Sequence, residues 1–170
     1  MKITFLGGGS FGTALAKSMT VIGHDVLLYV RDQERVRHIN EEHINEKYLK
    51  GIQLPENLKA TSDLKKALTG REIIVLAVPS NAVRDIAEKI KPHLRGDEII
   101  VSIAKGIDPK TLRPLSETIL DIINTDPVIL SGPSHAEELA LELPTTLVAS
   151  SHNELAMVRV QEAFSCDTLR

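Results

Sequence analysis

The sequence predicts an α/β fold in which a doubly wound, mostly parallel sheet carries helices on both faces. Short apolar runs alternate with segments whose apolar residues recur at helical spacing, which is typical of βαβ units. Two of the runs, at 73–78 and 99–103, are apolar at nearly every position, as expected for strands buried on both faces. The 170 residues are expected to form one domain.

The expected elements follow one another in a regular order. Strands are predicted at 3–6, 26–30, 73–78, 99–103, 128–130 and 145–150. Helices are predicted at 11–22, 32–47, 63–69, 80–90, 114–123, 134–142 and 153–164. Gly23 ends the first helix as a C′ glycine would, and the helix at 32–47 is mostly charged. The chain stops in a β-like fragment at 167–170 and therefore looks truncated.

Composition excludes several classes of protein. Lys and Arg number 20 and Asp and Glu number 23, for a net charge of −3, which argues against a nucleic-acid binder with a basic face. No apolar run approaches the roughly 18 residues of a membrane-spanning helix. The single cysteine, Cys166, rules out an internal disulfide and a multi-cysteine metal site, and we expect no metal. Without a signal-peptide pattern, a cytoplasmic location is expected.

A glycine-rich turn carries the strongest functional signal. Gly7, Gly9 and Gly12 fit the pattern G-x-G-x-x-G directly between the first strand and the first helix. In this context the first glycine permits a tight turn, the second lets the backbone approach a pyrophosphate, and the third lets helix and strand pack closely. The pattern predicts a Rossmann-type NAD(P) site; the alternative is a flexible glycine turn without a ligand.

The end of the second strand bears on the choice between NADP and NAD. Arg31 is suited to pairing with a 2′-phosphate or stacking on adenine, whereas Asp32 is suited to bonding the ribose hydroxyls of NAD. Arg31 favours NADP, with NAD left open. The alternative is a solvated Arg31–Asp32 pair at a helix start.

Three loops follow strands at the edge where ligands bind in such sheets. Residues 78–81 either wall the cofactor or merely stop a strand, with Ser80 capping the next helix. Lys105 is placed to hold a substrate oxygen and stabilise charge on it; the alternative is a surface lysine. In the third loop, residues 131–138, the Ser134 hydroxyl and the free backbone amides either bind substrate oxygens or only cap a helix. His135 is interpreted as a packing or capping residue.

Together these motifs resemble the amino-terminal part of NAD(P)-dependent glycerol-3-phosphate dehydrogenases. The resemblance covers essentially the whole chain and rests on an ordered series of five segments. These are GGGSFGTA at 7–14, YLKGIQLP at 48–55, AVPS at 77–80, AKGI at 104–107 and GPSHAEE at 132–138.

The resemblance implies a reversible hydride transfer between NAD(P)H and dihydroxyacetone phosphate, giving sn-glycerol 3-phosphate for phospholipid synthesis. Beyond the glycines, the implied cofactor contacts are Ser10, Phe11, Arg31, Tyr48, Lys105 and Ala136. The implied substrate contacts are Lys105, Gly132 and Ser134. Tryptophan often stands in the family where this chain has Phe11.

The family continues into a helical carboxy-terminal domain that supplies a second lysine, the proposed proton donor, and an Arg-Asn pair for the substrate phosphate. These positions are absent from the 170 residues, so we expect dinucleotide binding with negligible turnover, and no catalytic residue is assigned. A homodimer is expected of the full-length enzyme. Two alternatives stay open: a related 3-hydroxyacid or ketopantoate dehydrogenase, and a non-catalytic dinucleotide sensor.

Overall fold

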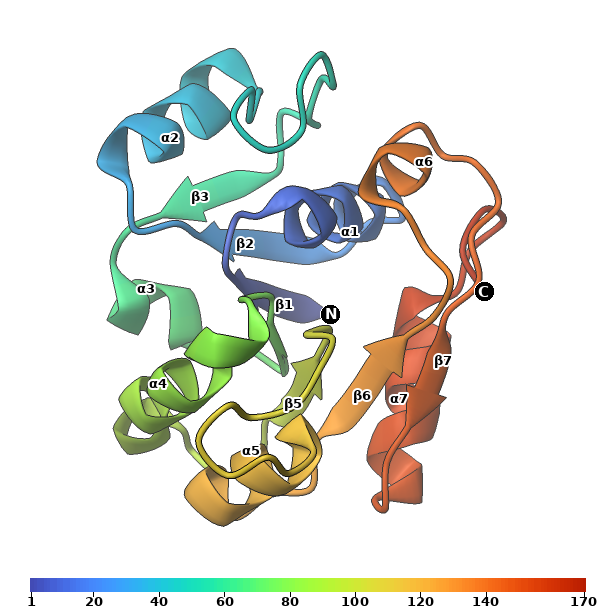
Figure 1. Ribbon diagram of the computed structural model, residues 1–170. Helices are drawn as coiled ribbons and strands as arrows, with labels where there is room; N and C mark the ends of the chain where they lie inside the picture. Colours follow the sequence, from blue (N-terminus) through green and yellow to red (C-terminus); the bar gives the residue numbers. More distant parts are fainter.

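The computed structural model describes all residues from Met1 to Arg170 and contains one seven-stranded sheet (Figure 1). The strands are β1 (Lys2–Leu6), β2 (Asp25–Tyr29), β3 (Lys59–Thr61), β4 (Ile73–Leu76), β5 (Ile99–Ser102), β6 (Val128–Ser131) and β7 (Val148–Ser150). Their order across the sheet is β3-β2-β1-β4-β5-β6-β7. All neighbours are parallel except β6 and β7, which are antiparallel. The predicted doubly wound sheet is confirmed, and its strand order reverses between β1 and β4, where such folds bind ligands.

Seven α-helices connect the strands. They are α1 (Ser10–Val21), α2 (Gln33–Arg37), α3 (Leu64–Leu68), α4 (Ser80–Ile90), α5 (Leu115–Ile123), α6 (Ala136–Ala140) and α7 (Glu154–Phe164). A wider helical turn, His38–Glu42, continues α2, and a 3₁₀ turn, Lys91–His93, follows α4. Gly23 lies just beyond α1 at a φ of +98°, so the predicted C′ glycine is confirmed. None of these helices combines the length and the apolar character needed to cross a bilayer.

The helices cover both faces of the sheet because the central strands are apolar on both faces. Along β4, Ile73 and Val75 belong to one buried cluster, while Ile74 and Leu76 belong to a second. The first cluster also takes side chains from α1, α6 and α7, and the second takes side chains from α3, α4 and α5. Helices α1 and α6 lie side by side, as do α4 and α5 (Figure 1).

Four elements differ from the sequence prediction. Strand β3 was not predicted, because its three residues, Lys-Ala-Thr, carry little apolar pattern. The helix predicted at 32–47 ends at Glu42, and His43 follows in the left-handed conformation with a φ of +56°. The helix predicted at 134–142 is limited to α6. The strand predicted at 145–150 is shortened, because Thr145 pairs instead with Leu169 near the carboxyl terminus.

Candidate functional site

The glycine turn between β1 and α1 packs directly against the chain that leaves β4. Gly7 has a φ of +126°, and a Cβ there would lie 2.3 Å from the carbonyl oxygen of Ala77. A Cβ on Gly12 would lie 2.8 Å from both the Ala77 Cβ and the Gly7 carbonyl oxygen. Backbone atoms cannot yield to such contacts, so these two positions require glycine for the packing of helix against strand.

Gly9 is glycine for a different reason. A Cβ at Gly9 would meet nothing within 4 Å, so the protein leaves open space beside this residue. Gly9 is also the N-cap of α1, and no side chain caps this helix. The amides of the first helical turn are therefore available to an external anion, which the helix dipole also favours. An open backbone at an uncapped helix is the arrangement that a pyrophosphate fits.

Two hollows meet at this turn. The Lys105 hollow, of about 420 Å³, is lined by Gly9, Ser10, Phe11, Gly12, Ala77, Val78, Pro79, Ile103, Ala104, Lys105, Ser134, His135, Ala136 and Glu137. The Arg31 hollow, of about 250 Å³, is lined by Gly7, Gly8, Gly9, Tyr29, Val30, Arg31, Arg35, Tyr48, Ala77, Val78, Pro79, Ala82, Asp85, Ile86 and Lys89. They share Gly9 and residues 77–79, so they form one groove across the point where the strand order reverses.

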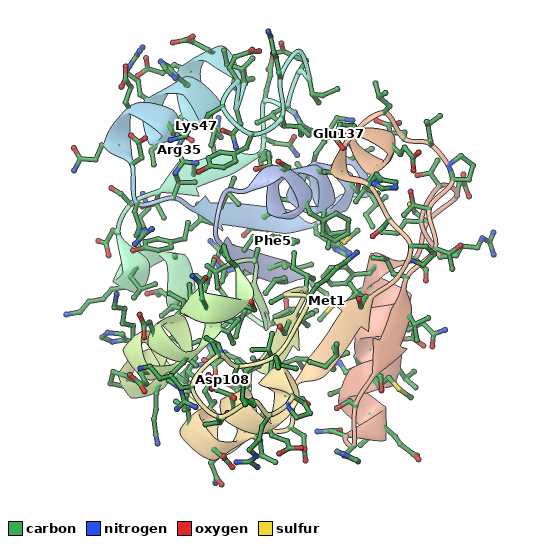
Figure 2. The ribbon with its side chains drawn as sticks, viewed as in Figure 1. Met1, Phe5, Arg35, Lys47, Asp108 and Glu137 are labelled. Atoms are coloured by element: carbon green, nitrogen blue, oxygen red, sulfur yellow. The ribbon has the colours of Figure 1, made fainter.

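The Arg31 hollow has two arginines with different environments. Arg31 is exposed and takes part in no ion pair. Arg35 donates from Nη1 to the Gly8 carbonyl oxygen at 3.2 Å, and its guanidinium lies 4.8 Å from the centre of the Tyr48 ring. Arg35 and Lys47, which flanks Tyr48, lie near one another in Figure 2. Arg35 and Tyr48 thus build the wall of this hollow, while Arg31 remains free to meet a ligand.

Asp32 serves the protein rather than the groove. Its carboxylate accepts hydrogen bonds from the Glu34 and Arg35 amides as the N-cap of α2, and it pairs with the Arg35 side chain at 3.3 Å. The Arg35 amide, followed by the Arg35 side chain, holds the pKa of Asp32 below its usual value. Asp32 lines neither hollow. The alternative of a solvated Arg31–Asp32 pair is wrong, because the partner of Asp32 is Arg35.

Lys105 and Ser134 come together at the opposite end of the groove. Lys105 Nζ donates to the Gly132 carbonyl oxygen at 3.1 Å, and Ser134 Oγ donates to the same oxygen at 3.4 Å. Gly132 itself lines neither hollow. A Cβ on Gly132 would lie 2.6 Å from the Thr146 carbonyl oxygen, so close packing explains this glycine. Of the three predicted substrate contacts, two side chains face the hollow and the third residue contributes its carbonyl group.

The predicted caps around the groove are wrong. Helix α4 begins at Ser80 and α6 begins at Ala136, and neither Ser80 nor Ser134 forms a side-chain cap. His135 occupies the N-cap position of α6 without a capping bond and is exposed in the Lys105 hollow. It is therefore neither a packing residue nor a side-chain cap. Glu137, on α6 beside α1 in Figure 2, lines the same hollow.

Three residues that support the groove were not singled out from the sequence. A Cβ on Gly8 would lie 2.7 Å from a methyl group of Val30, so this position, like Gly7 and Gly12, leaves no room for a side chain. Arg35 and Asn45 both donate to the Gly8 carbonyl oxygen, Asn45 from Nδ2 at 3.1 Å. The run of three glycines signalled Gly8; Asn45 carries no local signal, because it lies 37 residues from its partner.

Known proteins match this chain along its whole length. Residues 2–157 match the model of the family described as the NAD-dependent glycerol-3-phosphate dehydrogenase N-terminus. A glycerol-3-phosphate dehydrogenase, NAD(P)+, of Clostridium botulinum is 47% identical over 169 residues, covering 99% of this chain and 51% of the relative. One from Thermoanaerobacter sp. is 44% identical, covering 100% and 51%. The chain thus spans about half the length of the curated relatives it matches.

A solved structure agrees with the sequence matches. The crystal structure of glycerol-3-phosphate dehydrogenase from Coxiella burnetii aligns with a TM-score of 0.93 at 32% identity, covering 99% of this chain and 52% of that one. The family model, the curated relatives and the solved structure all agree on glycerol-3-phosphate dehydrogenase. The chain belongs to the NAD-dependent glycerol-3-phosphate dehydrogenase family and corresponds to its amino-terminal part.

Proposed function

We propose that the groove binds NAD(P) and that the protein transfers a hydride between this cofactor and dihydroxyacetone phosphate, giving sn-glycerol 3-phosphate. The uncapped amino terminus of α1, placed between the two hollows, carries the proposal. It suits a pyrophosphate at Gly9 and Ser10, with the adenosine half in the Arg31 hollow and the nicotinamide half in the Lys105 hollow. Phe11 and Ala136, which line the latter, would contact the nicotinamide half.

In this proposal the chain binds and polarises the substrate at Lys105. The bound dinucleotide supplies or accepts the hydride. The Lys105 ammonium stabilises the negative charge that develops on the substrate oxygen. This stabilisation lowers the barrier most when the ammonium is already held in position before the reaction. Ser134 offers its hydroxyl to the same substrate, and the Gly132 carbonyl holds the ammonium in place at 3.1 Å.

The Arg31 hollow favours NADP over NAD. Arg31 is exposed and free of ion pairs, so its guanidinium can pair with a 2′-phosphate. Asp32, the residue suited to the ribose hydroxyls of NAD, is already engaged as the cap of α2. We therefore propose tighter binding of NADPH than of NADH.

The dehydrogenase activity is proposed for a protein of the relatives' length, since the chain matches only about half of each relative. For that protein we propose a homodimer in the cytoplasm that supplies phospholipid synthesis and binds no nucleic acid. Sedimentation velocity and cell fractionation test the assembly and the location.

A titration of this chain with NADPH and NADH, followed by nicotinamide fluorescence, tests cofactor binding. The protein lacks tryptophan, so its own background is low. We expect saturable binding that Gly9→Val abolishes and Arg31→Ala weakens. Lys65→Ala, which removes an exposed cation from α3, is the charge-matched control. Absence of binding by a folded sample would contradict the proposal.

A second titration addresses the substrate. Dihydroxyacetone phosphate is added to the NADPH-saturated chain, and we expect a further fluorescence change that Lys105→Ala removes. Binding of NADPH without any response to dihydroxyacetone phosphate would contradict a substrate contact at Lys105 in this chain.

A further inference from the structure

Lys105 lies on a long connection, residues 103–114, between β5 and α5. Most of this connection is exposed, and Leu112 has a φ of +58°. It closes on itself through two backbone hydrogen bonds, from Asp108 to the Arg113 carbonyl oxygen at 3.0 Å and from Leu112 to the Asp108 carbonyl oxygen at 2.8 Å. Those bonds shape the outer part of the loop. They do not attach it to the rest of the protein.

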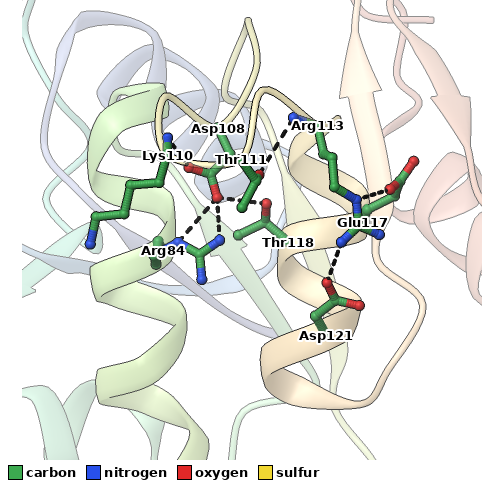
Figure 3. Close-up of polar contacts among 8 residues, drawn as sticks. All are labelled: Arg84, Asp108, Lys110, Thr111, Arg113, Glu117, Thr118 and Asp121. Atoms are coloured by element: carbon green, nitrogen blue, oxygen red, sulfur yellow. Dashed lines mark hydrogen bonds and ion pairs between the residues drawn. The ribbon is translucent and has the colours of Figure 1, made fainter.

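The attachment is made by the one deeply buried side chain in the exposed part of the loop. Asp108 has a side chain that is 2% exposed and that lies between α4 and α5 (Figure 3). Its Oδ2 accepts hydrogen bonds from both Nε and Nη2 of Arg84 on α4 and, at 2.9 Å, from the Thr118 hydroxyl on α5. Its Oδ1 accepts the Lys110 amide at 2.8 Å. Both carboxylate oxygens are thus used.

The contacts with α4 fall on one helical face. Ser80 and Arg84 are four residues apart and therefore neighbours on the helix surface. Gly106 approaches Ser80, since a Cβ on Gly106 would lie 3.5 Å from the Ser80 side chain. Two residues later, Asp108 meets Arg84. The loop therefore runs along one face of α4, and Pro79, the N-cap of α4, lines the groove.

Lys105 is tethered closely to this attachment. It lies three positions before Asp108, and three residues span at most about 10 Å of extended chain. On its other side, the Lys105 ammonium reaches across to the Gly132 carbonyl oxygen. The ion pair of Arg84 with Asp108 thus fixes the loop close to Lys105, whose side chain lines the Lys105 hollow.

We propose that Arg84 and Asp108 are positioning residues, which hold the loop against α4 so that Lys105 faces the bound cofactor and substrate. This inference rests on the proposed function, because it gives Lys105 a ligand to meet. Neither Arg84 nor Asp108 lines the groove. Both act through the backbone of residues 105–108.

A second network nearby provides the comparison. Arg113 pairs with Glu117 and Asp121 of α5, but all three side chains are about half exposed. Exposed pairs contribute little to stability, because water screens them. This network begins where the loop has already reached α5, so Arg113→Gln is a matched control. It removes a loop arginine with two carboxylate partners and leaves the attachment to α4 intact.

A double-mutant cycle on this chain tests the proposal, with the dissociation constant for NADPH as the readout. Lys105→Ala and Asp108→Asn should each weaken binding, Asp108→Asn by about fivefold, within the range of couplings between residues of one network. The double variant should bind no more weakly than Lys105→Ala alone, because Asp108 acts through Lys105. A purely structural role would weaken binding by the same factor in both backgrounds.

Variants of Arg84 keep the test valid if Asp108→Asn does not fold. Arg84→Gln should reproduce the loss of affinity, Arg84→Lys should restore part of it, and Arg113→Gln should leave it unchanged. If Lys105→Ala weakens binding while the Asp108 and Arg84 variants do not, or do so additively, the positioning role is wrong and the proposed function stands. If Lys105→Ala has no effect while Gly9→Val abolishes binding, the role of Lys105 fails and the positioning role fails with it.

Discussion

The glycine turn and the Lys105 loop border the same groove, but different forces shape them. In the glycine turn, residues 7–12, the conformation follows from missing side chains: Gly7, Gly8 and Gly12 each lie where a Cβ would collide with a neighbour. In the Lys105 loop, residues 103–114, it follows from a buried carboxylate that binds two helices. One segment is held by steric exclusion and the other by polar attraction.

This difference matters for how each segment can fail. A close-packed turn tolerates no added atom, because protein interiors are packed as densely as organic crystals. A loop whose attachment to a helix rests on an ion pair depends on the charge state of that pair. We therefore expect the turn to respond to volume and the loop to respond to charge and pH. The following predictions test that distinction, beginning with the largest effect.

The first prediction compares the same added methyl group at two glycines of the turn. Gly7→Ala places a Cβ 2.3 Å from the Ala77 carbonyl oxygen at a φ of +126°, so we expect a loss of at least about 3 kcal/mol in the free energy of unfolding. Gly9→Ala meets open space and should change stability by less than about 0.5 kcal/mol. Urea unfolding measures both. Equal losses would break the steric account of the turn.

The second prediction concerns acid and the Lys105 loop. The Lys110 amide, with Arg84 and Thr118, holds the pKa of Asp108 well below the ordinary value of an aspartate. A lowered folded-state pKa stabilises the protein above the unfolded value, and this stabilisation is lost as the pH falls below it.

Asp108→Asn should therefore lower the urea midpoint most at pH 7, with a difference from wild type that shrinks between pH 4 and pH 2. The same series on Gly7→Ala should show a difference independent of pH. If the difference in urea midpoint between Asp108→Asn and wild type did not depend on pH, the charge of Asp108 would not be what stabilises the loop.

The third prediction separates the two arginines of the Arg31 hollow. Arg31→Ala should weaken NADPH binding about tenfold, equivalent to about 1.4 kcal/mol, with a smaller effect on NADH, because only NADPH carries a 2′-phosphate. Arg35→Ala should weaken both cofactors by a similar factor, since Arg35 contacts Gly8 and Tyr48 of the protein itself. Paired fluorescence titrations measure the four constants. Equal losses for both cofactors with Arg31→Ala would contradict NADP selection.

The smallest effect is expected at Arg113. Arg113→Gln removes two ion pairs on the surface of α5 and should leave the thermal midpoint within experimental error at physiological ionic strength. A fall in the thermal midpoint comparable with that of Asp108→Asn would contradict this prediction. It would show that the buried Asp108 network and the exposed Arg113 network of Figure 3 contribute equally to stability.

The sequence predicted most of the fold because the strongest signals were local. The continuous apolar run at 73–78 predicted β4, and the glycines at 7–12 located the turn before α1. Weak or context-dependent signals gave the errors. Residues 145–147 resemble a strand, yet they pair with the last residues of the chain instead of extending β7.

The candidate site divides in the same way. Local sequence determined the glycine turn, Arg31 at the end of β2, and the placing of Lys105 and Ser134 after two later strands, because the carboxyl ends of parallel strands meet at one edge. Tertiary structure alone decided which carboxylate holds a loop, as Asp108 does. The capping bonds of Asp32 reach only residues 34 and 35, whereas the bond of Asp108 to Arg84 joins residues 24 positions apart, and no local periodicity records such a contact.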